Sequence, residues 1–549
     1  MDRKTRNKIY SRAMKFAVIS FMAFTILSMR LFWIQIVKGQ KYGLEAGKQY
    51  VREIRVAPAR GNIFDRNNIQ LTNNKTEKTV FILKDVVISD NSILASLKET
   101  FNFTEKDIEI IRKSNNRVVE LPLRTEIKEN IAVRGVIVED KVFRYNGNNL
   151  LSHVIGYIKR SENVGEYGIE KEYDSILKVS NRSGIKYIAV DGKNRVIPGI
   201  MDTEVISDKK SSTNSIKLTV DINIQKEVER ILDSNKANGA AIVTDVLTGD
   251  ILAMASRPNL NQNDIGANFN SNRMDFYNKA LEVSYPPGSI FKTVVLMTAL
   301  SENIISLDDT FICLGYEDLG SFQIRCNKTD GHGEMTAYEA FSESCNSAFI
   351  QIGKKVGAKK IIEMAEKLGF GKRVQNILIE SAGNLPKNDE LLGPAIGNIS
   401  IGQSNIEVTP LQVTNMMMII ANEGIKKDIG IVDSIVTEDG RFVKKVIREE
   451  DERILPTRLC EQIKYCLEGV VDSGTAKNID LSGIGDAAGK TGSAENNKNN
   501  THAWFSGYFP RENPRYVITV FIEEGGSGGI IAVPIFEEIA KSIFDIDLK

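Results

Sequence analysis

The longest run of hydrophobic residues lies close to the N-terminus. Phe16 to Met29 is apolar, Arg30 interrupts the run, and Leu31 to Val37 continues it. Read as one helix, residues 16–37 span roughly 33 Å at about 1.5 Å per residue, which is enough to cross a bilayer. The pattern therefore predicts a transmembrane helix over 16–37.

The charge before this run predicts how the helix is oriented. Residues 1–15 contain six lysines and arginines and a single acid, Asp2. By the positive-inside rule, residues 1–15 form a cytoplasmic tail and the chain after the helix lies outside the membrane. A cleaved signal peptide is the alternative, but the bulky stretch Met29 to Trp33 offers no small-residue cleavage site. We therefore expect an uncleaved single-pass protein of the cell membrane.

Shorter patterned segments follow the helix. Alternating runs such as Val51 to Val56 and Val80 to Ile88 predict strands, and no nucleophile or metal-binding spacing appears among them. A polar stretch at 207–212 marks a break. We predict a noncatalytic domain over 38–215 and a second domain over 216–549.

The second domain combines strand and helix patterns. Strands are predicted at 240–244, 250–255, 503–509 and 516–522, the first two joined as a hairpin by a turn at Thr248-Gly249. Helices are predicted at 289–300, 339–352, 359–368 and 534–544. An α/β (α+β) fold, with an antiparallel sheet flanked by helices on both faces, buries all of these apolar faces in one core.

The composition argues against a nucleic-acid partner and against a framework of disulfide bonds. The 549 residues carry 71 basic and 71 acidic side chains, so a nucleic-acid partner is not expected. Five cysteines are too few for a disulfide framework in a chain of this length, and their odd number leaves at least one free thiol or metal ligand.

A hydroxyl and an amine stand one helical turn apart at Ser289 and Lys292. Pro286, Pro287 and Gly288 precede them, and Lys292 is the only charged residue of an apolar helix. Burial would lower the pKa of this lysine and allow it to act as a base toward Ser289. The spacing alone is common, because Ser175 and Lys178 share it in a polar stretch.

Two later stretches give the pair a context. Ser344-Cys345-Asn346 and Lys490-Thr491-Gly492 follow it in that order, and the whole set resembles the one shared by penicillin-binding proteins and serine β-lactamases. Further stretches resemble the pedestal domain of class B penicillin-binding proteins, which is noncatalytic: Arg60 to Asn67, His153 to Tyr157 and Gly168 to Asp174. The resemblance implies the transpeptidase fold for 216–549 and a pedestal of the dimerisation type for 38–215.

The resemblance also implies the catalytic roles. Ser289 would be the nucleophile and Lys292 its base. Ser344 would connect Lys292 with Lys490, which passes a proton to the leaving amine, and Asn346 would bind the substrate amide.

The same resemblance implies a substrate-binding strand. The hydroxyls of Thr491 and Ser493 would bind the substrate carboxylate, and Gly492 would leave room for the substrate along the strand. Ser493 stands where the family usually has threonine, so the hydroxyl is kept and a methyl group is lost. No cofactor is required for this chemistry.

The expected activity is that of a peptidoglycan D,D-transpeptidase. Its partners would be stem peptides ending in D-Ala-D-Ala, β-lactams that acylate the serine, and a membrane glycosyltransferase of the shape, elongation, division and sporulation family. A β-lactam-hydrolysing or β-lactam-sensing protein is one alternative, although no Glu-x-x-Leu-Asn stretch lies between Ser344 and Lys490 to activate water. A mainly structural role as a scaffold for the glycosyltransferase is another.

A candidate metal site lies between the nucleophile helix and Ser344. Cys313, Cys326, Asp330 and His332 could bind a structural zinc ion, although their spacing matches no standard zinc-finger pattern. A Cys313–Cys326 disulfide and two ordinary buried thiols are the alternatives.

Overall fold

The computed structural model describes most of the chain, namely residues 2–39, 42, 51–56, 60–125, 133–160, 162–178, 185–192, 214–266, 274–320, 322–496 and 500–548. The polar break predicted at 207–212 lies outside these residues.

The predicted membrane helix is present and extends beyond the hydrophobic run. Helix α1 spans Arg3–Phe32, and a π-helical turn, Trp33–Val37, continues it. An 18-residue window of this segment has a mean hydropathy of 1.9 and no buried residues. The cations of Arg30 and Lys38 lie 5.1 and 4.1 Å from the Trp33 ring centroid, a combination typical of a membrane interface.

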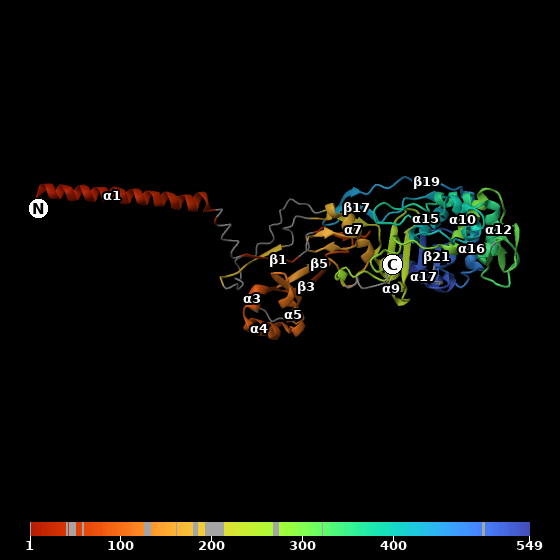
Figure 1. The fold of residues 1–549 in the computed structure, drawn as a ribbon, viewed down its shortest axis with the longest axis horizontal. Coiled ribbons are helices and arrows are strands. Elements are labelled where there is room, and N and C mark those ends of the chain that lie inside the picture. Colours follow the sequence, from red (N-terminus) through yellow and green to blue (C-terminus); the bar gives the residue numbers. More distant parts are fainter. Residues whose placement is uncertain are drawn as a thin grey trace. The chain divides into compact units, whose positions relative to one another are not determined.

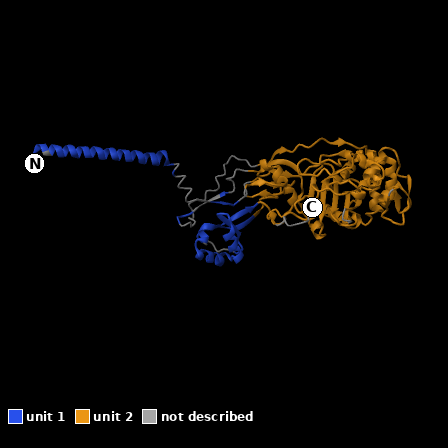
Figure 2. Cartoon of the chain, in the orientation of Figure 1, with its two compact units in different colours: residues 1–58, 76–143, 180–210 blue, residues 59–75, 144–179, 211–549 orange. Residues whose placement is uncertain are grey.

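The chain forms two compact units, and each is built from separate stretches (Figure 2). Unit 1 comprises 1–58, 76–143 and 180–210, and unit 2 comprises 59–75, 144–179 and 211–549. Two stretches of the predicted domain 38–215 therefore pack with the residues that carry the predicted active site.

Besides α1 and its π-helical continuation, the described part of unit 1 contains two small sheets and three helices. Strands β1 (Val51–Arg55) and β8 (Ile185–Ala189) pair antiparallel. A second sheet has the order β4 (Val118–Pro122), β3 (Lys75–Leu83), β5 (Val136–Phe143). Its helices are α3 (Lys84–Ile88), α4 (Asn91–Phe101) and α5 (Glu105–Lys113).

One strand prediction in unit 1 was wrong over half its length. The strand expected at Val80 to Ile88 ends at Leu83, and the next five residues form α3. A short apolar run does not distinguish a buried strand from a buried helix.

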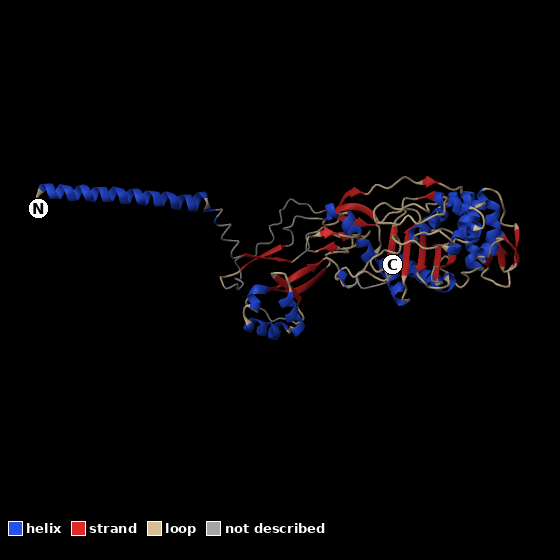
Figure 3. Cartoon of the chain, in the orientation of Figure 1, coloured by secondary structure: helices blue, strands red, loops and turns tan. Residues whose placement is uncertain are grey.

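A five-stranded antiparallel sheet forms the centre of unit 2 (Figures 1 and 3), which confirms the predicted fold class. Its strands, in spatial order, are β11 (Ile251–Ser256), β10 (Gly239–Asp245), β22 (Tyr516–Ile522), β21 (Thr501–Phe509) and β20 (Ala488–Glu495). Helices α9 (Ile222–Ser234) and α17 (Val533–Asp547) pack together on one face, and α15 (Pro410–Ala421) packs on the other.

The remaining elements of unit 2 surround this sheet. A four-stranded sheet has the order β18 (Phe442–Lys445), β17 (Val432–Thr437), β9 (Asn214–Leu218), β2 (Ile63–Phe64). Two-stranded ribbons are β6/β7 (Ile158–Lys159, Val164–Gly165), β12/β15 (Thr310–Cys313, Gly333–Thr336), β13/β14 (Tyr316–Asp318, Gln323–Arg325) and β16/β19 (Ile425–Lys426, Glu452–Arg453). Further helices of unit 2 are α6 (Ser152–Ile155), α7 (Gly168–Glu172), α8 (Asp174–Leu177), α13 (Ala358–Lys367), α14 (Ala395–Ser400) and α16 (Thr457–Asp472).

A buried ion network ties the two early stretches of unit 2 together. Glu170 is fully buried and accepts hydrogen bonds from Arg60 Nε (2.8 Å), Arg144 Nε (2.7 Å) and the Tyr145 hydroxyl (3.0 Å). Removing one partner of a buried ion pair leaves an uncompensated charge. This buried ion network therefore fixes the residues around Arg60 within unit 2.

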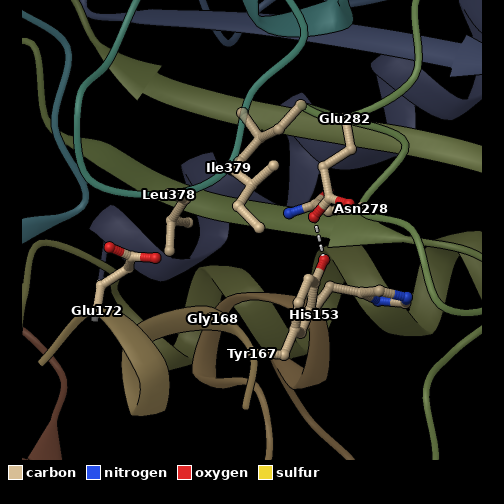
Figure 4. Close-up of a pocket in the computed structure, with 9 residues that line it drawn as sticks. His153, Tyr167, Gly168, Glu172, Asn278, Glu282, Leu378 and Ile379 are labelled. Atoms are coloured by element: carbon tan, nitrogen blue, oxygen red, sulfur yellow. Dashed lines mark hydrogen bonds between the residues drawn. The ribbon is translucent and has the colours of Figure 1, made fainter. Parts of the chain in front are cut away.

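A small pocket lies between residues 144–179 and the segment before the nucleophile (Figure 4). Its volume of about 10 Å³ suits one water molecule. The Tyr167 hydroxyl donates a hydrogen bond to Glu282 Oε1. Burial raises the pKa of Glu282 to about 7 and lowers the pKa of the nearby His153 to about 4, so both groups favour their neutral forms.

We predict that Glu282 makes unfolding depend on pH. Because its folded pKa is raised above the ordinary value of 4.5, its stabilising contribution is complete below about pH 4.5 and is lost as pH rises through 7. Glu282→Gln keeps an acceptor for Tyr167 and cannot ionise. Relative to wild type, the variant should be about as stable at pH 5 and more stable at pH 8, by about 1–3 kcal/mol.

Thermal unfolding of the detergent-solubilised protein at both pH values measures this difference. Glu450→Gln, at an exposed position, is the control and should show no such pH dependence. A Glu282→Gln variant whose unfolding temperature relative to wild type is the same at pH 5 and pH 8 would contradict the prediction.

Candidate active site

The predicted nucleophile lies in a tight turn at the start of an apolar helix. Ser289 belongs to a 3-10 turn, Gly288–Phe291, that leads directly into α10, Lys292–Ser301. Gly288 has φ +53°, and a Cβ there would lie 2.6 Å from the Ser493 carbonyl oxygen. Glycine at this position therefore allows the turn to approach strand β20.

The Lys292 amine is fully buried and has three hydrogen-bond acceptors. Its Nζ donates to the Ser344 carbonyl (2.6 Å), Asn346 Oδ1 (2.7 Å) and Ser344 Oγ (3.3 Å). Burial lowers the lysine pKa to about 8. Among the described residues, the Ser289 hydroxyl forms no hydrogen bond, so proton transfer from Ser289 to Lys292 stays a prediction.

The helix predicted at 339–352 is interrupted at Ser344, so this prediction was wrong at that point. The structure has two helices there, α11 (Ala337–Ser342) and α12 (Asn346–Val356), and Ser344 lies in the break with φ +55°. The Cys345 thiol caps α12 by accepting a bond from the Ala348 amide (3.4 Å). The break directs the Ser344 carbonyl and the Asn346 side chain toward one lysine, a strained geometry of the kind found at functional sites.

The Lys490-Thr491-Gly492 stretch lies on β20, the edge strand of the central sheet. Lys490 is fully buried, and its Nζ donates to the Thr491 carbonyl (3.2 Å). Burial and the charge of Lys292 hold the Lys490 pKa well below its usual value. Within the described residues Lys490 forms no hydrogen bond to Ser344, so the predicted connection between the lysines is present only on the Lys292 side.

Close packing against the nucleophile turn explains why position 492 is a glycine, which the sequence alone did not show. A Cβ at this position would lie 2.8 Å from Ile290 Cγ1 and 2.9 Å from the Pro287 carbonyl. Side chains alternate along a strand, and Ser493 is exposed on the opposite face. Glycine at 492 therefore lets the nucleophile turn rest against the strand.

Sequence reasoning missed Thr475, which contacts the predicted substrate-binding strand. Its hydroxyl lies 2.5 Å from the Thr491 hydroxyl, close enough for a strong hydrogen bond. Thr475 follows helix α16, and a small-residue run, Ser473-Gly474-Thr475-Ala476, was the only signal for it in the sequence.

The predicted metal cluster forms with one different member. Ligand atoms of Cys313, Cys326, His332 and Cys345 lie within 4.8 Å of one another, and Asp330 does not belong to the group. The sequence-based prediction was limited to Cys313, Cys326, Asp330 and His332. It did not include Cys345, which the fold brings close to the other two cysteines and His332. All five cysteines are free thiols.

The spacing of these atoms fits a tetrahedral zinc ion. Cys326 Sγ lies 3.7 Å from Cys345 Sγ and 3.6 Å from His332 Nδ1. For ideal zinc–sulfur and zinc–nitrogen bonds, the corresponding tetrahedral edges are about 3.8 and 3.6 Å. Three thiols and one imidazole are also a standard structural zinc set.

The cluster is directly connected to the catalytic candidates. Cys345 precedes Asn346 in the chain, and Asn346 Nδ2 donates to the carbonyl of Arg325, the residue before Cys326 (3.1 Å). A shift of the cluster would therefore move an acceptor of the Lys292 amine.

Two domain families match this chain. Residues 239–541 match the penicillin binding protein transpeptidase domain, and residues 55–213 match the penicillin-binding protein dimerisation domain.

Similar proteins match the chain along most of its length. Stage V sporulation protein D of Bacillus subtilis is 29% identical over 96% of this chain and 84% of its own. Peptidoglycan D,D-transpeptidase MrdA of Escherichia coli K12 is 26% identical over 93% of this chain and 91% of its own. A solved chain described as a peptidoglycan synthase complex that coordinates polymerization and crosslinking is similar in fold, with TM-score 0.69, 22% identity and coverage of 97% of this chain and 98% of that one.

Proposed function

This chain belongs to the class B penicillin-binding proteins, and we propose that it cross-links peptidoglycan as a D,D-transpeptidase through an acyl-enzyme on Ser289. The observation that carries this proposal is the fully buried Lys292 amine, which belongs to the helix that follows the Ser289 turn and donates hydrogen bonds to Ser344 and Asn346.

Lys292 activates the nucleophile. With a pKa of about 8, roughly a tenth of this lysine is neutral at pH 7. The neutral amine accepts the Ser289 proton while Oγ attacks the penultimate D-Ala carbonyl of a stem peptide. The proton is then transferred to the nitrogen of the terminal D-Ala as the peptide bond breaks, and an acyl-serine ester remains.

The turn and the strand β20 provide the rest of the chemistry. Backbone N–H groups of Ser289 and Ser493 stabilise the oxyanion, each by about 3 kcal/mol. Thr491 and Ser493 bind the terminal carboxylate, and Lys490 contributes to the proton route. A neighbouring stem peptide's amine then attacks the ester, forms the cross-link and returns the serine proton.

β-Lactams imitate the D-Ala-D-Ala end of a stem peptide and acylate Ser289. The amide that is cleaved is part of a ring, so the leaving group stays attached to the acyl-enzyme. Hydrolysis of that ester is the second candidate function, because a β-lactamase uses the same acylation step. The absence of a Glu-x-x-Leu-Asn stretch between Ser344 and Lys490 favours the transpeptidase.

Helix α1 anchors the enzyme in the cell membrane as a single span. The six cations among residues 1–15 favour a cytoplasmic N-terminus and an extracytoplasmic catalytic domain. A membrane glycosyltransferase of the shape, elongation, division and sporulation family supplies the glycan strands. The similarity to a synthase complex that joins polymerization with crosslinking supports this partner.

Cys313, Cys326, His332 and Cys345 hold a structural zinc ion that fixes Asn346 and Ser344 in place. The tetrahedral distances support zinc, and free thiols remain the alternative. The ion takes no part in acyl transfer.

We predict that Ser289→Ala abolishes covalent labelling by a fluorescent penicillin, because Ser289 is the proposed nucleophile and precedes the buried Lys292 by one helical turn. Labelling is read by gel fluorescence and intact mass. Ser175→Ala, which changes the same Ser-x-x-Lys spacing at an exposed position, is the matched control and should label fully. Labelled Ser289→Ala protein would refute the nucleophile, and release of hydrolysed drug within seconds from wild type would favour the β-lactamase.

We predict that Thr475→Val lowers the acylation rate constant at least tenfold with D-Ala-ending ester substrates, because the Thr491 hydroxyl loses its 2.5 Å partner. Thr475→Ser keeps a hydroxyl and should retain most activity. A substrate whose terminal carboxylate is replaced by an amide should react equally with wild type and Thr475→Val. An equal loss on both substrates would indicate a general structural defect instead.

We predict that the purified protein contains about one zinc per chain and that Cys345→Ser loses it. Chelation should lower the thermal unfolding temperature and penicillin acylation together, because the cluster holds Asn346. Asp330→Asn and Cys460→Ser are the controls and should keep the metal. Less than a tenth of an equivalent of zinc in protein purified without added metal would refute the site.

A further inference from the structure

A pocket of about 400 Å³ lies in unit 2 and shares no residue with the site described above. Pockets of this size hold small molecules in proteins. It is lined by the end of α13 and the turn after it, by one residue of α15, and by the β16/β19 ribbon, namely Glu366, Lys367, Gly369, Lys372, Arg373, Val374, Asn415, Lys426, Glu452, Arg453 and Ile454.

The pocket lining is strongly cationic. Its five lysines and arginines exceed its two glutamates by three charges. Only Arg453 has partners for its guanidinium, which donates to the Glu423 carbonyl (2.6 Å) and Thr457 Oγ1 (3.0 Å). The other four form no salt bridge with any residue that the structure describes, although the charge of Arg373 also acts on the buried Glu380 carboxylate.

The turn that carries two of these cations is rigidly held. Gln412 Nε2 donates to the Lys372 carbonyl (2.7 Å), and the buried Glu380 carboxylate accepts from the amides of Val374 (3.0 Å) and Gln375 (3.0 Å). A fixed backbone places the Lys372 and Arg373 side chains at one edge of the pocket without a cost in loop ordering.

The inner wall carries an unpaired hydrogen-bond acceptor. Asn415 is 1% exposed, and its Nδ2 donates to the Leu368 carbonyl (2.9 Å). Its Oδ1 is buried and has no partner among the described residues. Buried polar atoms normally find a partner, so an unpaired acceptor in a pocket wall indicates a missing donor. Gly369, with φ +93°, contributes no side chain that would cover Asn415.

We propose that this pocket binds a phosphorylated polyol or sugar, whose phosphate lies among Lys367, Lys372, Arg373 and Lys426 and whose hydroxyl donates to Asn415 Oδ1. Rim glutamates Glu366 and Glu452 accept from further hydroxyls. Sulfate can pair with these cations but has no hydrogen-bond donor for Asn415 Oδ1. Such a group exists both as a free small molecule and as a lipid headgroup.

Calorimetric titration of the full chain in neutral detergent with glycerol 3-phosphate tests the proposal. Binding should be at least tenfold tighter than sulfate at equal ionic strength. The Lys372→Gln/Arg373→Gln variant should weaken it at least tenfold. Lys359→Gln/Lys444→Gln removes two exposed lysine charges outside the pocket and should bind like wild type. Penicillin labelling, expected to be unchanged in both variants, shows that they are folded.

A second arm distinguishes the two sources of the group. Micelles doped with phosphatidylglycerol, compared with phosphatidylcholine, should raise the unfolding temperature of wild type and not of Lys372→Gln/Arg373→Gln if the headgroup is the ligand. A response to either glycerol 3-phosphate or phosphatidylglycerol that the pocket variant loses supports the proposal. No response to both, a response that the variant keeps, or sulfate binding as tightly as glycerol 3-phosphate overturns it.

Discussion

The candidate active site depends on two lysine amines that the fold removes from water. Lys292 and Lys490 are both fully buried, and among the described residues neither has a carboxylate partner. Burial of this kind lowers the pKa of each ammonium group, and the charge of Lys292 lowers the pKa of Lys490 further. Lowered pKa values suit the proposed proton transfers, in which Lys292 accepts the Ser289 proton and Lys490 helps to deliver a proton to the leaving amine. The carbonyl of Ser344 and the amide of Asn346 stabilise whichever charge remains on Lys292.

The backbone around these amines explains several residue choices. The nucleophile turn lies so close to β20 that a Cβ at Gly288 or Gly492 would collide with the opposing element. The break between α11 and α12 brings Ser344 and Asn346 to the same amine, and the cysteine that caps α12 is also a member of the thiol cluster. Catalytic geometry and the candidate metal site are therefore parts of one local structure.

Much of this arrangement could be predicted from sequence. The membrane helix, the central hairpin, β21, β22 and α13 follow apolar periodicities that tertiary packing does not override. The candidate catalytic residues were proposed because their ordered motifs resemble a known set. The break at Ser344 could not be predicted, because the helical pattern continues through it and only tertiary contacts favour a left-handed serine. Cys345 and Thr475 were missed because each meets its partner through the fold and not through sequence spacing.

Unit 2 is built from three separate stretches of the chain, which determines when its sheets can form as the protein is synthesised. Strand β2 at residues 63–64 pairs with β9 at 216–217, and β9 pairs with β17 near residue 432. A ribosome must therefore deliver more than four hundred residues before this sheet can close, whereas the β3–β5 sheet of unit 1 is complete by residue 143. Glu170 and β9, the partners of the Arg60 stretch, are available by residue 218, but the sheet stays open until β17 is synthesised, with its hydrophobic residues accessible to chaperones and proteases. Quality control of this enzyme should consequently act mainly on chains that have not yet reached β17.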